Sequence, residues 1–440
     1  MRKLPFIIVC IAAVLATIPL PDKSLSAQSE EIIKTGEVLN LDRCIQIALL
    51  KQPSILAAYF TLEANRSRVG EALANYYPQI GASGGYSRYS SPGVLTEVNS
   101  ILYGTGYFNE YTSSLTLSQN IYDFGKTSSQ VKIQKFNLDS AGSDLETSKE
   151  QIVLSVKQAY YAVIQTARNR KVADESVGQY KQHLDQARGF FDVGTKPRYD
   201  VITAEVNLSN AKLNLITADN ALKIARVNLN NAMGVPDAPV YTVEDSLAFI
   251  KYKITLDDAL SKAMANRPDI KSLALRRRAV EASVQLAKTG YYPALTGSTS
   301  YNWQGGTGLP LESEWNVGVT LSFPIFSGFL TKHQVEEAVS NLNVARANEE
   351  ALRLSVVLDV QQSYLNLKQA EDSIDTADLA VKQATENLDI ANGRYAAGVG
   401  NPIEVTDAQI VYSNAKLAYI QALTNYNVAH ASLLKAMGER

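Results

Sequence analysis

The sequence has little of what metal sites, disulfide frameworks and nucleic-acid surfaces require. Its 440 residues include 2 cysteines and 3 histidines, and the formal net charge is −2. The histidines, His183, His333 and His430, lie far apart without metal-ligand spacing, so we expect surface histidines and no metal site. With no net positive charge and no extended Lys/Arg-rich stripe, we expect no nucleic-acid partner. No cofactor is expected.

Catalytic motifs are missing as well. Asp123-Phe124-Gly125 matches a protein-kinase triplet, but the phosphate loop and the catalytic loop are absent, so we interpret it as a turn between a strand and a helix. The glycines at 104–106 and 305–306 do not follow a strand that opens a helix, as a dinucleotide site requires. We therefore expect that the protein is not an enzyme.

The first 27 residues differ from the rest. Arg2 and Lys3 precede an apolar run at 4–20, and a polar stretch then ends at Ser26-Ala27. This order is typical of a secretory signal peptide cleaved after Ala27, and the alternative is an uncleaved membrane anchor. The apolar run is short for a spanning helix.

Cleavage leaves a chain with few ways to attach to a membrane. Cys10 lies inside the apolar run, too early for a lipoprotein attachment site, so we expect no lipid on the mature N-terminus. Cys44 then remains alone and cannot form an intrachain disulfide; a small buried helix residue explains it. No apolar run after residue 27 is long enough for a membrane helix. An exported chain of this kind is either soluble or crosses a membrane as strands.

The rest of the sequence contains the same landmark residues twice. Leu41 recurs as Leu256, and Tyr76-Tyr77-Pro78 recurs as Tyr291-Tyr292-Pro293, both at an offset of 215 residues. Later landmarks, such as Gly194 and Gly398, keep an offset of 204. Two copies at a constant register predict an internal duplication, with one change of length after the Tyr-Tyr-Pro motif.

Each copy contains two segments that alternate apolar and polar residues. The pattern is clearest at 294–304 and 314–324 and weaker at 79–90 and 111–121. Strict alternation predicts strands with one apolar and one polar face. About ten residues is the length that crosses a bilayer at a tilt, and a soluble sandwich is the alternative. Aromatic residues near these strands are typical of a membrane interface, and they include Tyr86, Tyr111, Tyr301, Trp303 and Trp315.

Long helices follow each strand pair. No proline interrupts 125–191, and the second copy behaves in the same way from Gly328 to Tyr395. Some 65 helical residues would make a rod of roughly 100 Å. Apolar residues recur every three or four positions with frequent alanine, which predicts coiled-coil packing. The turns at 193–197 and 398–402 contain Gly and then Pro, so we expect antiparallel hairpins with tight tips.

These expectations define the domains. We predict a signal peptide at 1–27, an N-terminal extension at 28–40, repeat 1 at 41–234 with a helical hairpin at 125–233, an equatorial linker at 235–255, and repeat 2 at 256–438 with a hairpin at 328–437. Four strands cannot close a barrel, and an open edge in lipid leaves backbone groups unpaired. The missing strands would then come from other subunits.

With the double repeat, the Tyr-Tyr-Pro before each first strand and the glycine-containing tips, the chain resembles the TolC-type outer-membrane efflux proteins from about 41 to 438. The resemblance implies a homotrimer with a barrel of about twelve strands and a long periplasmic α-helical barrel. It also implies the outer membrane of a Gram-negative bacterium. The implied partners are a periplasmic adaptor protein and an inner-membrane pump, and the cargo would be drugs, other small toxic compounds or proteins.

The resemblance also assigns residues at the hairpin tips. Tyr395 and Gly398 match the family pattern, and Asp200, Glu404 and Asp407 match acidic positions that surround the periplasmic entrance. The family's arginine is replaced by Gly400, which puts the usual latch in doubt, and Lys196 holds the equivalent place in the first copy. The expected adaptor-docking tips comprise Val193, Gly194, Thr195, Gly398, Val399 and Gly400.

Two other functions remain as alternatives. A passive outer-membrane porin would explain the strands but not the long helical hairpins, since porins have short periplasmic turns. A periplasmic coiled-coil adaptor or structural protein would explain the hairpins but not four strands of bilayer length.

Overall fold

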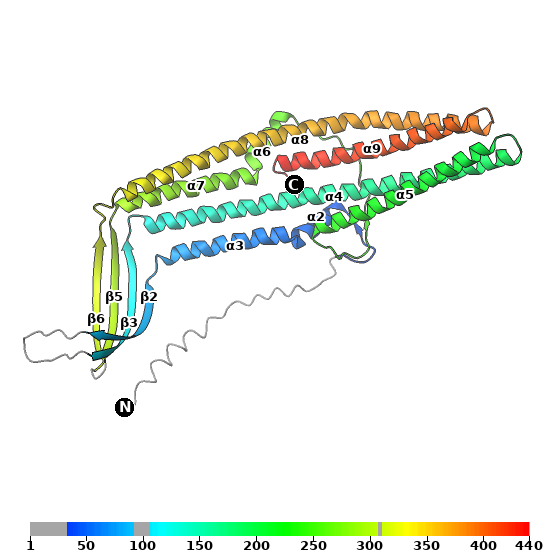
Figure 1. Ribbon diagram of the computed structural model, residues 1–440. Helices are drawn as coiled ribbons and strands as arrows, with labels where there is room; N and C mark the ends of the chain where they lie inside the picture. The colour runs from blue at the N-terminus through cyan, green and yellow to red at the C-terminus, as the bar shows by residue number, and fades with distance from the viewer. Residues whose placement is uncertain (1–32, 92–105, 307–309, 440) are drawn as a thin grey trace, which may run out of the picture.

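The computed structural model describes residues 33–91, 106–306 and 310–439. It shows a long rod of helices with a four-stranded sheet at one end (Figure 1). The expectation of a mainly α fold with a separate β part is confirmed. The predicted signal peptide and part of the N-terminal extension lie outside the described residues.

The two halves of the chain have the same order of elements. The first half consists of α2 (Leu41–Lys51), α3 (Pro53–Ala74), β2 (Gln79–Ser91), β3 (Gly106–Tyr122), α4 (Lys126–Asp192) and α5 (Arg198–Met233). The second half consists of α6 (Leu256–Asn266), α7 (Pro268–Lys288), the short 3-10 helix η2 (Thr289–Tyr291), β5 (Ala294–Gly306), β6 (Glu312–Ser322), α8 (Leu330–Ala396) and α9 (Pro402–Ala436).

The helices α4 and α8 run the length of the rod. Each has 67 residues, which corresponds to roughly 100 Å at the helical rise. Near the sheet the helices neighbour one another in the order α3, α4, α7 and α8. Toward the far end α5 packs on α4 and α9 packs on α8, which forms two hairpins (Figure 1).

The turn from β3 into α4 shows why the Asp-Phe-Gly triplet is structural. Phe124 has a positive φ of 51°. The Asp123 carboxylate accepts hydrogen bonds from the backbone N–H groups of Gly125 and Thr127 at 3.1 and 2.7 Å. Asp123 therefore satisfies backbone donors at the start of α4 that have no partner within the helix.

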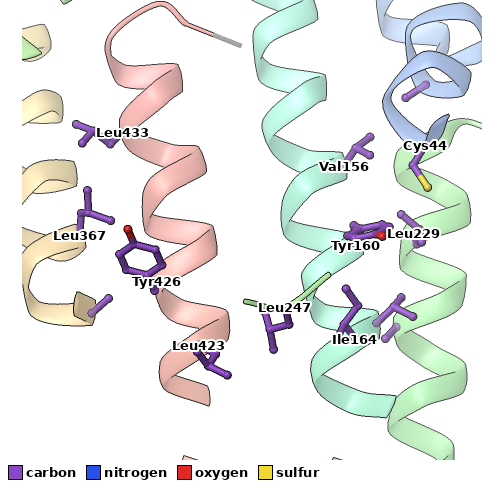
Figure 2. Packing of buried hydrophobic residues seen from close by; sticks show 14 of the residues in the cluster. Cys44, Val156, Tyr160, Ile164, Leu229, Leu247, Leu367, Leu423, Tyr426 and Leu433 are labelled. Atoms are coloured by element: carbon purple, nitrogen blue, oxygen red, sulfur yellow. The ribbon is translucent and has the colours of Figure 1, made fainter. Parts of the chain in front are cut away.

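The core lies halfway along the rod, where the predicted equatorial linker crosses the helices. The strand β4 (Thr242–Val243) of this linker pairs in parallel with β1 (Val38–Leu39). Figure 2 shows Leu247 of the linker between α4 and α9, with Tyr160 and Tyr426 on either side of it. Cys44 is fully buried in this cluster, as expected for a small helix residue.

Candidate functional site

The first candidate region consists of the two hairpin tips. Each tip is a glycine turn in which a backbone N–H reaches back to the last helical turn, from Thr195 to the Phe190 oxygen at 2.9 Å and from Val399 to the Arg394 oxygen at 3.1 Å. This is the usual glycine-dependent end of a helix. One valine at each tip, Val193 and Val399, has 72% of its surface exposed. The tips thus present small apolar surfaces.

Tyr395 connects the two hairpins just above the tips. It lies on α8, is fully buried, and packs against two rings of α4. Its ring centroid is 4.8 Å from that of His183 and 5.6 Å from that of Phe190. Lys196, in the first tip, places its Nζ 6.0 Å from the Tyr395 ring centroid. Tyr395 and Lys196, two predicted entrance residues, therefore meet across the hairpins.

Two polar atoms of this cluster, the Tyr395 hydroxyl and the His183 Nδ1, are buried without a hydrogen-bond partner among the described residues. Asp200 at the start of α5 is 7% exposed. Burial lowers the pKa of His183, and the charge of Asp200 acts in the opposite direction. Burial raises the pKa of Tyr395, and the Asp200 charge adds to that shift.

His183 corrects the expectation of a surface histidine. Only 7% of its surface is exposed, because it faces Tyr395 of the second hairpin. The helical pattern of one copy could not show this contact, because it joins segments more than 200 residues apart. His430 also departs from the expectation, since it is half-buried and its buried Nε2 has no hydrogen-bond partner among the described residues. His333 is exposed, as expected, and its Nδ1 lies 2.9 Å from a Glu336 oxygen.

Gly400 stands where the family pattern has an arginine, and the backbone explains the glycine. A Cβ atom at this position would lie 2.7 Å from the backbone nitrogen of Tyr395. A different arginine supplies a cation nearby, since the Arg394 Nε lies 3.3 Å from a Glu404 oxygen. Sequence reasoning missed Arg394, although its place before Tyr395 and opposite the start of α9 was a usable signal.

The acidic residues assigned to the entrance have different surroundings. Asp200 is buried between the hairpins, and Glu404 is exposed and paired with Arg394. Asp407, one turn further along α9, is exposed and forms no ion pair with a described residue. Within one chain, the structure does not bring these three carboxylates into one cluster.

The second candidate region is the sheet, whose strand order is β2-β3-β5-β6 and whose pairs are all antiparallel. The register places most apolar residues of the four strands on one face. Ala82, Leu115, Tyr301 and Trp315 form one continuous row across it. Serine, threonine, asparagine and glutamate residues cover the opposite face, where Glu110 accepts a hydrogen bond from Ser87 at 3.2 Å.

The predicted interface aromatics share the apolar face. Tyr86 and Tyr111 are cross-strand partners with ring centroids 5.2 Å apart, and the Tyr301 and Trp303 centroids are 4.6 Å apart. Trp315 is 71% exposed. All five lie nearer the loop ends of their strands than the helices. Exposed aromatic rings on an apolar sheet face are typical of a membrane interface.

A second band of aromatics lies where the strands meet the helices, and sequence reasoning did not identify it as one. Phe124 stacks on Tyr292 at 5.6 Å and meets the edge of Tyr122 at 4.6 Å. Further exposed members are Tyr76, Tyr77, Tyr291, Phe326 and Phe329. The repeated Tyr-Tyr-Pro motifs had pointed to this band, but they served only as landmarks of the duplication.

In residues 33–91, 106–306 and 310–439, no single helix combines the length and apolarity of a membrane span, whereas α2 and α3, bent by 47° at their junction, reach that length and apolarity together. No group of three or more His, Cys, Asp and Glu side chains in this part of the chain could hold a metal ion.

Comparison with known proteins agrees with this architecture. A sequence model of the family described as "Outer membrane efflux protein" matches residues 44–235 and 259–439. The outer membrane protein TolC of Escherichia coli is 25% identical over 416 residues, covering 91% of this chain and 82% of TolC. Protein CyaE of Bordetella pertussis is 24% identical over 409 residues, covering 91% of this chain and 84% of CyaE.

Solved structures have the same fold. The Campylobacter jejuni CmeC outer membrane channel superposes with a TM-score of 0.77 at 20% identity, covering 90% of this chain and 85% of CmeC. The Vibrio cholerae outer membrane protein VceC gives a TM-score of 0.75 at 18% identity, covering 91% of this chain and 96% of VceC.

Proposed function

Since the chain belongs to the outer membrane efflux protein family, and is thus an outer-membrane export channel of a Gram-negative bacterium, we propose that three copies assemble into one continuous duct. The family is one of channels rather than of enzymes, and we propose no catalytic activity. The duct would carry drugs, other small toxic compounds or proteins from an inner-membrane pump to the outside.

The observation that carries the proposal is the open sheet with one apolar and one polar face. Among the described residues, β2 pairs only with β3 and β6 pairs only with β5. In lipid, each unpaired backbone group at such an edge costs several kcal/mol. Pairing β2 of one copy with β6 of the next removes both edges. Three copies then close a barrel of about twelve strands with the polar face toward the lumen.

The helices extend this barrel on the periplasmic side. Because α4 follows β3 and α8 follows β6 through short connections, the closed ring of strands leads into a ring of helices of roughly 100 Å. The interior would be wet and the exterior would face the periplasm. A rod of this length serves a connection between membranes, which a passive porin does not need.

The tips would contact the periplasmic adaptor protein of such a system. Val193 and Val399 are the exposed apolar residues of the two tips, and Gly194, Thr195, Gly398 and Gly400 shape the turns around them. Matching small apolar surfaces on hairpins of an adaptor would pack against them. The pump would act through this adaptor.

The entrance residues would control how closely the two hairpins approach each other. Tyr395, Lys196 and Asp200 join hairpin to hairpin inside one copy, and the Arg394–Glu404 pair braces the second tip. In a trimer, Asp407 and Glu404 would recur around the mouth and create a negative potential that favours cations.

The experiment that tests the assembly is the native mass of the protein extracted in mild detergent from isolated outer membranes. A trimer is expected, and a monomer released with the soluble periplasm would exclude the duct and favour a periplasmic coiled-coil protein. Deleting residues 193–197 and 399–401 distinguishes the export duct from the remaining alternative, a passive porin. A passive porin keeps its permeability after this deletion, whereas an export duct loses pump-dependent efflux.

A further inference from the structure

A groove of about 990 Å³ lies between α4 and α7 directly below the sheet. Four cationic side chains line it, namely Lys132, Lys135, Arg278 and Lys288. None of the four forms an ion pair with a described residue, although ion pairs are common elsewhere along these helices. The one acidic lining residue, Glu281, is already paired with Arg277. The groove therefore concentrates positive charge that the chain itself leaves unbalanced.

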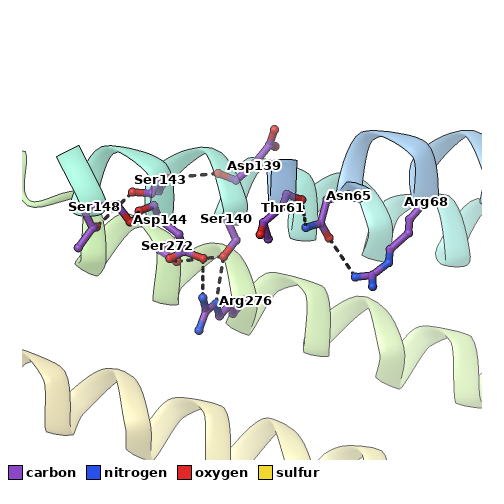
Figure 3. Close-up of polar contacts among 11 residues, drawn as sticks. Thr61, Asn65, Arg68, Asp139, Ser140, Ser143, Asp144, Ser148, Ser272 and Arg276 are labelled. Carbon is purple, nitrogen blue, oxygen red and sulfur yellow. Dashed lines mark hydrogen bonds and ion pairs between the residues drawn. The ribbon is translucent and has the colours of Figure 1, made fainter. Parts of the chain in front are cut away.

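The three consecutive arginines 276–278 have three different surroundings. Arg276 binds Asp144 at 2.5 Å and Ser140 at 3.1 Å on one side of the α4–α7 contact (Figure 3). Arg277 binds Glu349 of α8 at 2.7 Å. Arg278 points about 200° away from Arg276 around the helix, into the groove. Helix packing accounts for the first two arginines and not for Arg278.

The groove opens at the membrane boundary of the proposed duct. Tyr76, which lines it, lies three residues before the start of β2, and Lys288 ends α7 shortly before β5. Lys132 and Lys135 lie within roughly 15 Å of the start of α4. The walls also contain the apolar side chains of Val131, Phe136 and Leu342. A ligand here would meet cations and apolar surface together, beside the second aromatic band.

This groove lies on the outer face of the helical layer. Its α4 residues belong to a stripe that continues in steps of three or four through 139, 142, 146, 150, 153 and 157 to Tyr160. The Tyr160 hydroxyl donates to the Glu244 backbone oxygen of the equatorial linker at 2.8 Å. If this face of α4 lined the channel of the duct, the linker would fill the channel. The channel therefore lies on the opposite face of the helical layer.

Other copies of the chain would leave the groove open. The helices near the sheet follow the order α3, α4, α7, α8, so α4 and α7 are the inner pair. Contacts between copies would form at the outer helices, below the edge strands β2 and β6. The groove thus faces the periplasmic leaflet of the membrane in the assembled duct.

We propose that this groove binds the headgroup of an anionic phospholipid from the periplasmic leaflet, with the phosphate between Lys132, Lys135 and Arg278. The proposal rests on the outer-membrane duct described above, because only that placement brings the groove to a leaflet. Anionic headgroups are attracted by clustered lysine and arginine at a membrane surface. The acyl chains would extend along the apolar sheet face past Tyr76.

Native mass spectrometry of the full-length protein in detergent, titrated with phosphatidylglycerol, tests the proposal. The wild-type trimer should retain bound lipid under collisional activation. The variant Lys132→Gln/Lys135→Gln/Arg278→Gln should bind at least about tenfold more weakly, since each cation contributes separately. The charge-retaining variant Lys132→Arg/Lys135→Arg should bind as the wild type does.

A matched control removes three other cations that are exposed and unpaired among the described residues, through Lys181→Gln/Lys212→Gln/Arg346→Gln. It should bind lipid as the wild type does. Equal binding by the groove variant and this control would overturn the proposal, as would displacement of the lipid by inorganic phosphate at the same concentration. The same spectra report the oligomer: a monomer contradicts the duct, whereas a trimer without bound lipid contradicts only the groove.

Discussion

At the scale of single residues, Gly400 is the position with the least freedom at the tips. We predict that Gly400→Ala loosens the second tip, because its Cβ would lie 2.7 Å from the Tyr395 backbone nitrogen. Overpacking of this kind costs about 1–3 kcal/mol. The expected result is faster tryptic cleavage after Arg394 in the folded trimer.

The control for this prediction is Gly393→Ala, in the last turn of α8 before the same tip. A Cβ at Gly393 would meet nothing within 4 Å, and alanine favours the helix by about 1 kcal/mol over glycine. Cleavage of this variant should be unchanged or slower. Equal acceleration in both variants would mean that the close approach at Gly400 does not determine the tip conformation.

His183 gives the contact between the hairpins a pH dependence. Burial lowers the pKa of His183 in the folded state, while Asp200 of α5 opposes the shift and Tyr395 of α8 covers the ring. When the hairpins separate, the histidine regains a pKa of about 6.5. The separated state then binds more protons, so the contact is complete above that pH and weakens as the pH falls through it.

We therefore expect hydrogen exchange in 177–208 to accelerate between about pH 7 and pH 5, beyond the intrinsic change in exchange rate. The variant His183→Gln keeps a polar side chain without a titration in this range. It should lose most of the extra acceleration. If the variant and the wild type respond identically to acid, His183 is not the group responsible.

At the scale of elements, the sequence predicted most of the architecture, for reasons visible in particular segments. Alternation at 294–304 and 314–324 corresponds to β5 (Ala294–Gly306) and β6 (Glu312–Ser322). The uninterrupted heptads correspond to the long helices α4 and α8. Both signals are local periodicities that follow from one buried face, so a single sequence contains them.

Periodicity in the sequence could not predict contacts between distant segments. The pairing of β1 with β4 involves two residues on each side and leaves no periodic pattern. The burial of His183 and the groove at Arg278 depend on which helices become neighbours. The Arg394–Glu404 pair crosses a turn whose exact geometry was unknown. These features arise from packing between elements, which periodicity within one element does not encode.

The hairpin tips provide the prediction that belongs to this scale. Replacing both exposed valines, as Val193→Asp/Val399→Asp, should abolish pump-dependent export, because a buried unpaired carboxylate at a docked tip costs several kcal/mol. The amount of trimer in the outer membrane should not change. Efflux of a fluorescent pump substrate and crosslinking to the adaptor are the measurements.

Val240→Asp is the matched control, since Val240 is 76% exposed but lies in the equatorial linker. It should export normally. Normal pump-dependent export by the double tip variant would show that the two valines are not part of the docking surface.

At the scale of the whole molecule, closure of the sheet between copies can be tested directly. Ser83 on β2 faces the polar side of the sheet, as do Glu314, Asn316 and Gly318 on β6. Cys44 is first replaced by alanine, the residue found at the equivalent position 259 of the second copy. In this Cys44→Ala background, Ser83→Cys is combined with a cysteine at each of the three β6 positions in turn. If β2 of one copy lies beside β6 of the next, at least one pair should oxidise into a covalently closed trimer on a non-reducing gel.

The geometry of disulfides makes this result specific. A bond requires Cα atoms within about 7 Å and side chains on the same face. The pair Ser83→Cys with Val317→Cys places the second thiol on the apolar face and should remain uncrosslinked. Crosslinking within one copy is excluded because β3 and β5 separate the two edges. If all three polar-face pairs run as monomers on the non-reducing gel although the native mass is that of a trimer, the copies join through their helices and the sheet edges remain apart.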